Sequence, residues 1–178
     1  RSGLAEAMHV GHAIDVQMGT LGKALGVSGG YIAGSRTLID WLINRARSFV
    51  FSTAPPPSVA CAASESLRIV QSAEGENLRQ RLWANVNRTK ETIIDAGWQL
   101  GPAMSPILPL IVGDEDQAMA IGRGLVERGL LAPAIRPPTV PKGESRIRIT
   151  ASATHSLPAI EALGAALEEL RQGPAPPS

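Results

Sequence analysis

A lysine set among small residues offers the most chemistry in the first part of the chain. Lys23 lies within residues 19–26, a stretch that contains three glycines. Glycines let the backbone approach a ligand closely, and a lysine amine shielded from water can lose its charge and attack carbonyl groups to form Schiff bases. Thr20, three residues earlier, could hold a phosphate beside that amine. The alternative interpretation is a solvated lysine in a flexible loop.

The same stretch does not fit the glycine-rich loops that bind nucleotides. A phosphate-binding loop needs a glycine six positions before the lysine and a Ser or Thr after it, whereas Gln17 and Ala24 occupy those places. The glycine pattern of a dinucleotide-binding turn is also missing after the expected strand.

Two adjacent hydroxyl side chains form a second candidate site. Ser52 and Thr53 follow a short apolar run and precede prolines at positions 55–57. We expect residues 48–51 to form a strand that the prolines stop, because proline cannot donate to a β-ladder. Ligands bind at strand ends in α/β sheets, so these hydroxyls could hold an anion. A solvated turn capped by Ser and Thr is the alternative.

Two arginines alternate with isoleucines along another expected strand. Arg146 and Arg148 should point to one face, and Ile147 and Ile149 to the other. A guanidinium matches a carboxylate with two parallel hydrogen bonds, so this face could bind a carboxylate ligand. Alternatively, both arginines are solvated or pair with acids such as Glu144.

The remaining reactive or aromatic residues form no comparable pattern, and we assign none of them to chemistry or to a metal site. They are His9, His12, His155, Cys61, Trp41, Trp83 and Trp98.

Short strands and helices alternate along the chain, which predicts an α/β fold. Alternation and turn residues predict strands over residues 14–18, 29–34, 48–51, 107–112 and 146–150. Apolar residues at helical spacing predict a helix capped by Ser35, helices over residues 58–72, 115–128 and 156–171, and a helix over residues 77–96 that Gly97 stops.

We place a domain boundary near residue 74, where Glu74-Gly75-Glu76 interrupts the helical pattern. Residues 1–73 and 74–172 would then be separate domains, the second of them βαβ-like with a proline-rich connection over residues 133–141. Residues 173–178 are predicted to be a disordered tail.

Composition excludes several classes of protein. Hydrophobic residues make up 44% of the 178 residues and the net charge is +1, so the chain can bury a core and has no basic excess for nucleic acid. A single cysteine excludes a disulfide scaffold and fits a reducing compartment. No apolar run reaches the roughly 20 residues of a membrane span. The first residue is Arg1, and we expect the chain to be part of a longer protein.

Several segments, taken together, resemble the α-oxoamine synthases, which are pyridoxal phosphate enzymes of the aspartate aminotransferase fold type. The matching segments follow the family order between about residues 14 and 171, and comprise residues 15–31, 46–57, 106–113, 135–141 and 145–150. Residues 47–53 and 136–141 favour the member that acts in biotin synthesis over 2-amino-3-ketobutyrate ligase and 5-aminolevulinate synthase.

The resemblance implies a fold and a set of residue roles. The fold would be α/β, with residues 1–73 forming the end of a large cofactor-binding domain and residues 74–172 a small C-terminal domain. Lys23 would bind pyridoxal phosphate as a Schiff base and later move the α-proton of the substrate. Thr20 would hold the cofactor phosphate, and Ser52 and Thr53 would reach the phosphate of a neighbouring subunit in a homodimer. Arg148 would bind the amino-acid carboxylate, whereas Arg146 would be structural.

The implied reaction is the decarboxylating condensation of L-alanine with a pimeloyl thioester of coenzyme A or of a carrier protein. A cytoplasmic enzyme with no nucleic-acid or membrane partner is expected. The family's aspartate that pairs with the cofactor ring nitrogen and its histidine that stacks on the ring lie upstream of the lysine, and residues 1–13 hold neither motif. The chain alone is therefore expected to be inactive.

Two alternatives remain open. One is another α-oxoamine synthase, such as a glycine C-acetyltransferase. The other is an interaction module related to the enzyme but without its chemistry.

Overall fold

The protein was analysed as a computed structural model that describes residues 3–172. The chain divides into two compact units, Arg1–Glu76 and Asn77–Ser178. The predicted tail at residues 173–178 lies outside the described residues. No helix in the described part of the chain is long and apolar enough to cross a membrane.

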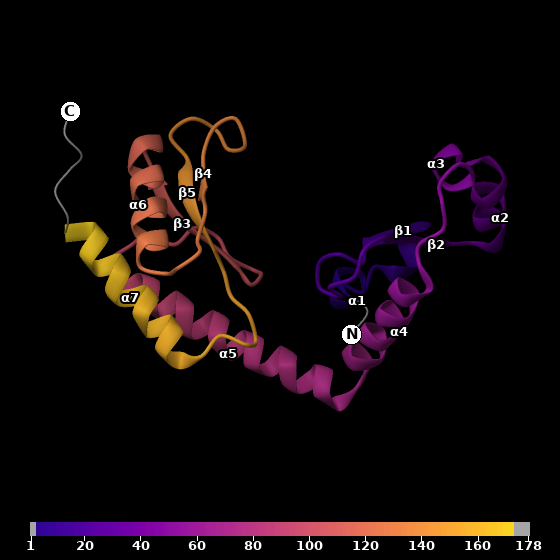
Figure 1. Ribbon diagram of the computed structural model, residues 1–178, viewed down its shortest axis with the longest axis horizontal. Helices are drawn as coiled ribbons and strands as arrows, with labels where there is room; N and C mark the ends of the chain where they lie inside the picture. The colour runs from indigo at the N-terminus through magenta and orange to yellow at the C-terminus, as the bar shows by residue number, and fades with distance from the viewer. Residues whose placement is uncertain (1–2, 173–178) are drawn as a thin grey trace. The chain divides into compact units, whose positions relative to one another are not determined.

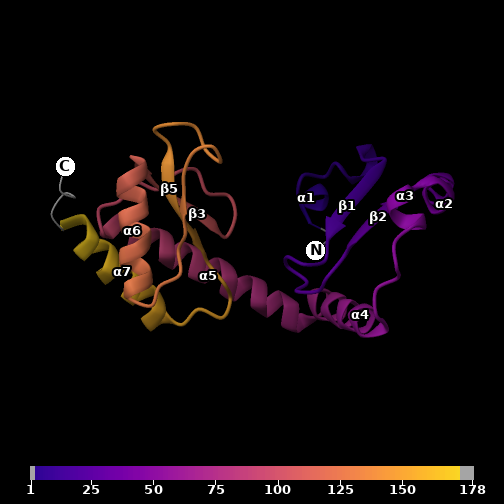
Figure 2. The same ribbon diagram turned by 45° about the horizontal axis from the view of Figure 1, so that its top comes forward.

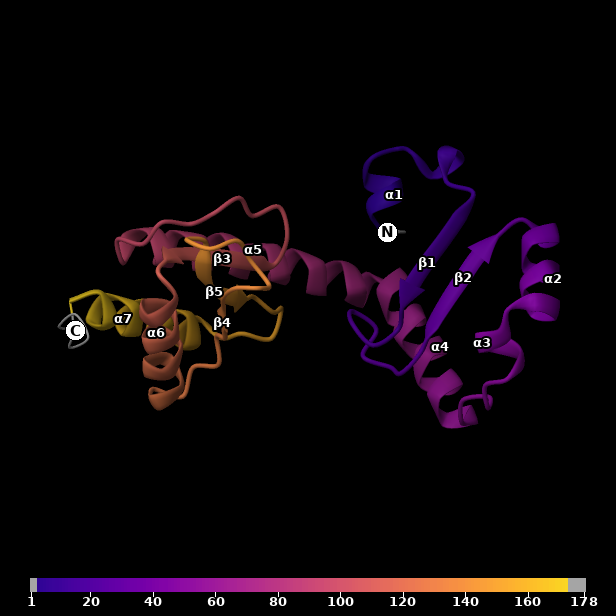
Figure 3. The ribbon, with the colours of Figure 1, turned by 90° about the horizontal axis from the view of Figure 1, so that it is seen from above.

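The first unit is built on a two-stranded antiparallel hairpin (Figure 3). Val16 pairs with Gly34 at one end, and Thr20 pairs with Gly30 at the other. The elements of this unit are α1 (Leu4–Ala7), the 3-10 turn η1 (Gly11–Ala13), β1 (Val16–Thr20), β2 (Gly30–Gly34), α2 (Arg36–Arg45), α3 (Arg47–Val50) and α4 (Pro57–Gln71). The predicted cap of α2 is confirmed, because the Ser35 hydroxyl accepts a hydrogen bond from the Leu38 N–H at 3.3 Å.

The predicted strand over residues 48–51 is wrong, because these residues lie in and directly after the helical turn α3. The Ala46 carbonyl accepts hydrogen bonds from the N–H groups of Phe49 and Val50, both at 2.9 Å. A four-residue apolar run fits a strand or a helical turn equally well, and here local hydrogen bonds decide the outcome.

The predicted break at Glu74-Gly75-Glu76 is also displaced. Helix α5 (Ala73–Asp95) already includes these residues, and the chain bends just before them. The Ser72 hydroxyl donates to the Ile69 carbonyl at 2.8 Å and accepts from the Gly75 N–H at 3.3 Å, so it joins the end of α4 to the start of α5.

The second unit contains a three-stranded sheet in the order β3–β5–β4, formed by β3 (Ile107–Gly113), β4 (Ala134–Ile135) and β5 (Ser145–Thr150) (Figure 1). Both β3 and β4 run antiparallel to β5, so they are parallel to each other. Helix α6 (Glu115–Glu127) connects them. The sequence interpretation missed β4, which is two residues long and lies in the proline-rich connection, and so took β5 as the second strand of the βαβ unit.

The core of the second unit lies between one face of this sheet and the helices α5, α6 and α7 (Leu157–Gln172) (Figure 2). Its fully buried residues include Val86, Ile93, Leu108, Leu110, Leu125, Ile147 and Leu167. The predicted end of α5 is confirmed, because Gly97 has φ +78°. Its N–H donates to the Ile94 carbonyl, and the Trp98 N–H donates to the Ile93 carbonyl, as in a Schellman motif.

Candidate active site

The turn that carries Lys23 closes the hairpin between β1 and β2. The Leu21 N–H donates to the Gly29 carbonyl at 2.9 Å, and the Val27 N–H donates to the Leu21 carbonyl at 2.9 Å. Within the turn, the Gly26 N–H donates to the Lys23 carbonyl at 3.1 Å. Gly26 has φ +65°, in the left-handed region that favours glycine. The local sequence therefore builds a tight turn on which Lys23 stands.

The side chains of Lys23 and Thr20 are both exposed in this chain. Val27, at 9% exposed, is the one buried apolar residue among the described positions of the first unit, and it fixes the far side of the turn. The residues of this unit thus present the amine and the hydroxyl but do not shield the amine from water as the glycine-rich sequence led us to expect.

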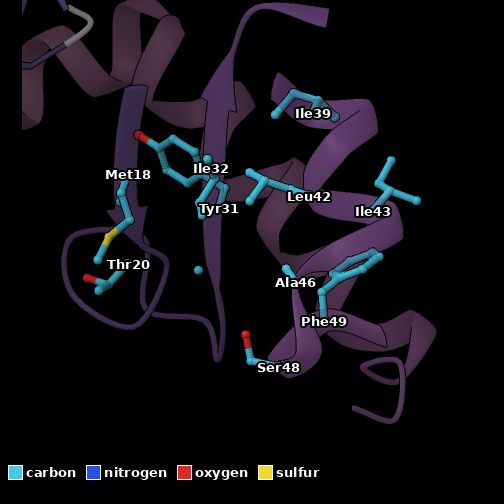
Figure 4. Close-up of a pocket in the computed structure, with 12 residues that line it drawn as sticks. Met18, Thr20, Tyr31, Ile32, Ile39, Leu42, Ile43, Ala46, Ser48 and Phe49 are labelled. Atoms are coloured by element: carbon cyan, nitrogen blue, oxygen red, sulfur yellow. The ribbon is translucent and has the colours of Figure 1, made fainter. Parts of the chain in front are cut away.

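An apolar hollow of about 540 Å³ lies beside Thr20, between the hairpin and the helices α2 and α3 (Figure 4). Tyr31 lies across Gly19, its partner in the β-ladder, because Gly19 has no side chain to displace the ring. Lys23 is not among the lining residues, which are Met18, Gly19, Thr20, Gly30, Tyr31, Ile32, Ile39, Leu42, Ile43, Ala46, Ser48 and Phe49.

Ser52 and Thr53 lie on the exposed segment between α3 and α4. The Ser52 hydroxyl donates to the Ser48 carbonyl, so its proton is already engaged within the chain. No hydrogen bond joins Ser52 or Thr53 to Thr20 or Lys23 in the described structure. The structure therefore brings Lys23 and Thr20 together at one end of the hairpin and places the two hydroxyls of positions 52 and 53 on a separate segment of the same unit.

The two arginines of β5 differ in what they contact. Arg146 donates through Nε to the Glu144 carbonyl and through Nη2 to the Glu144 carboxylate, both at 2.9 Å. The Arg148 side chain is exposed and has no hydrogen-bond or ion-pair partner among the residues the structure describes. Ile147 and Ile149 are buried on the opposite face, so the predicted alternation is confirmed.

The residues of β3 that neighbour Arg148 on its face of the sheet are apolar. Pro109 of β3 lies directly opposite Arg148 in the ladder, and Ile107 and Ile111 lie two positions to either side of Pro109. On the other side, the Arg148 N–H donates to the Pro133 carbonyl at 2.9 Å. Because no described acidic side chain engages it, the Arg148 guanidinium is available to bind a carboxylate through two parallel hydrogen bonds.

One contact to the lysine turn comes from a residue that the sequence analysis did not single out. The Ser66 hydroxyl of α4 donates to the Leu25 carbonyl at 2.9 Å. The signal available in the sequence is the helical spacing of Ser66 with apolar residues of α4. In the structure these residues form a half-buried stripe whose apolar members are Val59, Ala63, Ile69 and Val70.

One carboxyl group of the first unit has a lowered pKa. On α4, the side-chain hydrogen bond from Arg68 lowers the pKa of Glu65 below its usual value. Both side chains are exposed, so this pair belongs to the surface of the helix. No group of three or more potential metal-ligating side chains occurs within residues 3–172.

The chain belongs to the aminotransferase class I and II family, whose profile matches residues 1–167. The 8-amino-7-oxononanoate synthase of Dechloromonas aromatica is 48% identical over 153 residues, which cover 86% of this chain and 39% of that protein. The enzyme of the same name from Anaeromyxobacter dehalogenans is 45% identical over 181 residues and covers 99% of this chain and 45% of its own length.

Solved structures give the same fold. The serine palmitoyltransferase of Sphingomonas wittichii has a TM-score of 0.88 and 32% identity, covering 95% of this chain and 42% of its own. A serine palmitoyltransferase from S. paucimobilis with bound PLP–myriocin aldimine has a TM-score of 0.86 and 26% identity, covering the same shares of the two chains. An 8-amino-7-oxononanoate synthase from Francisella tularensis, at 24% identity and a TM-score of 0.74, covers 88% of this chain and 45% of its own and supports the fold alone.

The chain therefore spans about two fifths of the length of the relatives and structures that it matches. These comparisons bear out the predicted resemblance and the α/β fold of a fold-type-I pyridoxal phosphate enzyme.

Proposed function

We propose that this chain is part of a pyridoxal phosphate-dependent acyltransferase that condenses L-alanine with a pimeloyl thioester, releasing the free thiol and carbon dioxide and giving 8-amino-7-oxononanoate for biotin synthesis. The observation that carries the proposal is the pair of Lys23 and Thr20 on the hairpin turn of a chain 48% identical to an 8-amino-7-oxononanoate synthase. The acyl donor would be carried by coenzyme A or by a carrier protein, and the cytoplasm would be the compartment.

The donor set on the hairpin fits the proposed cofactor. Pyridoxal phosphate has an aldehyde, which an amine such as Lys23 can bind covalently, and a phosphate, which a hydroxyl such as Thr20 can bind. When bound, the cofactor supplies the electron sink that stabilises negative charge at the substrate's α-carbon. The aspartate that tunes the ring nitrogen in the family would come from chain beyond the residues present here.

Lys23 would act first as the anchor of the cofactor and then as the base at the substrate's Cα. A base must reach the proton that it removes, and a primary amine on a tight turn can be aimed more precisely than one on a mobile loop. The amine must also be uncharged to act, and its exposure in this chain means that the rest of the protein would have to exclude water around it.

Arg148 would bind the carboxylate of the amino acid. Its guanidinium is free, whereas that of Arg146 is engaged by Glu144. A bidentate ion pair between this guanidinium and the carboxylate would fix the orientation of the substrate.

Ser52 and Thr53 would bind the cofactor phosphate of a second subunit, which makes a homodimer the working unit. Two features support this assignment. Both residues are exposed on a segment followed by prolines, and neither is hydrogen-bonded to Thr20 or Lys23 within the described chain. The Ser52 proton would have to leave the Ser48 carbonyl to serve a phosphate.

A second candidate is another synthase of the same family that uses glycine or serine with a different acyl donor. The TM-score of 0.88 to a serine palmitoyltransferase supports this alternative. The 48% identity to an 8-amino-7-oxononanoate synthase, against 32% to that serine palmitoyltransferase, favours the first proposal.

The test is a substrate panel on the full-length protein that contains this segment. Release of the free thiol, on coenzyme A or on the carrier protein, is measured with L-alanine, glycine or L-serine, each offered with pimeloyl, acetyl or palmitoyl thioesters of either carrier. Release only with L-alanine and the pimeloyl donor supports the proposal. Release with another pair transfers the assignment to the second candidate, and release with none rejects both.

A further inference from the structure

The lysine turn is tied to helix α4 by one side chain from far along the sequence. The Ser66 Oγ lies 2.9 Å from the Leu25 carbonyl oxygen, and 41 residues separate the two partners. The contact is partly buried, so it is screened from competing water better than a bond on the open surface.

This bond acts on the same peptide unit that closes the turn. The Leu25 carbonyl and the Gly26 N–H belong to one planar group, so they can only move together. Ser66 holds the oxygen side of that group, and the Lys23 carbonyl accepts from its N–H side at 3.1 Å. Without Ser66, the group could rotate out of the turn, because Gly26 imposes little steric restriction on its own backbone.

A serine is unusual at this place in α4. The neighbours of Ser66 on the half-buried stripe are apolar, and a hydroxyl there needs a partner, which the turn provides. Ser64, two residues earlier, has the same chemistry but is exposed and points to another face of the helix.

We propose that Ser66 is a positioning residue for Lys23: it fixes the Leu25–Gly26 peptide group and thereby the turn on which the amine stands. The assignment of Lys23 as the cofactor lysine rests on the proposed function, whereas the claim that Ser66 fixes the turn does not.

The experiment compares Ser66→Ala with Ser64→Ala, the same change on an exposed face of the same helix, in the full-length protein. Hydrogen–deuterium exchange of the peptide spanning residues 21–29, without cofactor, reports on the turn. We expect exchange to be faster by roughly two- to ten-fold in Ser66→Ala, the range that one hydrogen bond confers, and unchanged in Ser64→Ala. Ser66→Thr keeps the hydroxyl and should keep most of the protection.

The second readout is the covalent capture of pyridoxal phosphate at Lys23, fixed by borohydride and measured by mass spectrometry. We expect slower capture in Ser66→Ala than in the parent protein and in Ser64→Ala. Equal exchange rates in the two alanine variants would show that Ser66 does not fix the turn. Faster exchange in Ser66→Ala with undiminished cofactor capture would show that Ser66 fixes the turn but does not position Lys23. A parent protein that captures no cofactor at Lys23 would instead reject the proposed function, while the exchange result would still decide the role of Ser66.

Discussion

Residues of the same type in this chain differ in what they can do because their contacts differ. Arg146 and Arg148 stand on the same face of β5, yet only Arg146 is engaged by an acid. The sequence alone predicted the shared face from the alternation with isoleucines. The choice between the two arginines needed either the family resemblance or the contact with Glu144, since nothing in their spacing distinguishes them.

We expect Arg148→Ala to weaken amino-acid binding strongly in the full-length enzyme. Removing one partner of a desolvated charge pair costs about 2–5 kcal/mol, which would raise the KM for the amino acid far more than it changes the KM for the thioester. Arg146→Ala is the matched control and should cost about 1 kcal/mol or less, since its pair is partly exposed. Equal effects of the two substitutions would remove the distinction between the arginines.

Ser145, at the start of β5, has a buried side-chain hydroxyl without a hydrogen-bond partner among the described residues. Its side chain is 1% exposed. Replacing an unsatisfied buried hydroxyl by a methyl group removes a desolvation cost, so Ser145→Ala should leave the free energy of unfolding unchanged or raise it by about 1 kcal/mol. Urea denaturation measures this, and a loss of more than about 1 kcal/mol would mean that the hydroxyl has a partner in solution.

At the scale of elements, the connections were harder to predict from sequence than the elements themselves. Long periodic segments such as α5 and α6 were predicted within a few residues, because their apolar stripes are extended. The turn α3 and the two-residue strand β4 were not, because a few residues carry too little periodicity to distinguish one local structure from another. The cap at Ser35 and the stop at Gly97 were predicted because each depends on one residue type in one conformation.

The bend between α4 and α5 explains why glycine occupies position 75. A Cβ there would collide with the Ile69 carbonyl oxygen and lie 2.9 Å from the Val70 carbonyl oxygen. The glycine was interpreted as a helix breaker, whereas its role is to let the backbone of α4 approach the first turn of α5.

Gly75→Ala should therefore destabilise the protein by about 1–3 kcal/mol, as overpacking against backbone does. Gly122→Ala in α6 is the control, because its Cβ would come no closer than 3.4 Å to its nearest neighbour, the Ala134 Cβ, which is ordinary van der Waals contact. That substitution should be neutral or stabilise by about 0.5–1 kcal/mol through the helical preference of alanine. Thermal unfolding of the two variants measures both, and a Gly75→Ala protein as stable as its parent would contradict the close approach.

At the scale of the whole molecule, the two units differ in how far they bury their own apolar residues. The second unit encloses a continuous core. The first leaves large side chains exposed, among them Met18, Trp41, Phe49 and Phe51. The sequence contains enough apolar residues for a core, but its composition does not show which of these side chains are buried by other residues of the same chain.

We expect this 178-residue chain alone to bind pyridoxal phosphate weakly and to show no turnover. Its lysine is exposed, and the family resemblance implies that the aspartate pairing with the cofactor ring nitrogen precedes this segment. Titration with the cofactor, followed by absorbance, measures the stoichiometry. Tight one-to-one binding would show that the residues present here suffice to form the cofactor site.

We propose that Lys23 carries the cofactor, and the other lysines of the chain serve as internal controls. The chain contains three lysines, Lys23, Lys90 and Lys142, and the Lys90 amine already donates to the Ala103 carbonyl at 3.0 Å. The most direct test is borohydride reduction of the full-length protein with pyridoxal phosphate, followed by peptide mapping. We expect the cofactor mass on Lys23, and the loss of both this mass and turnover in Lys23→Ala. The cofactor on another lysine, or turnover without Lys23, would show that a different residue carries the cofactor.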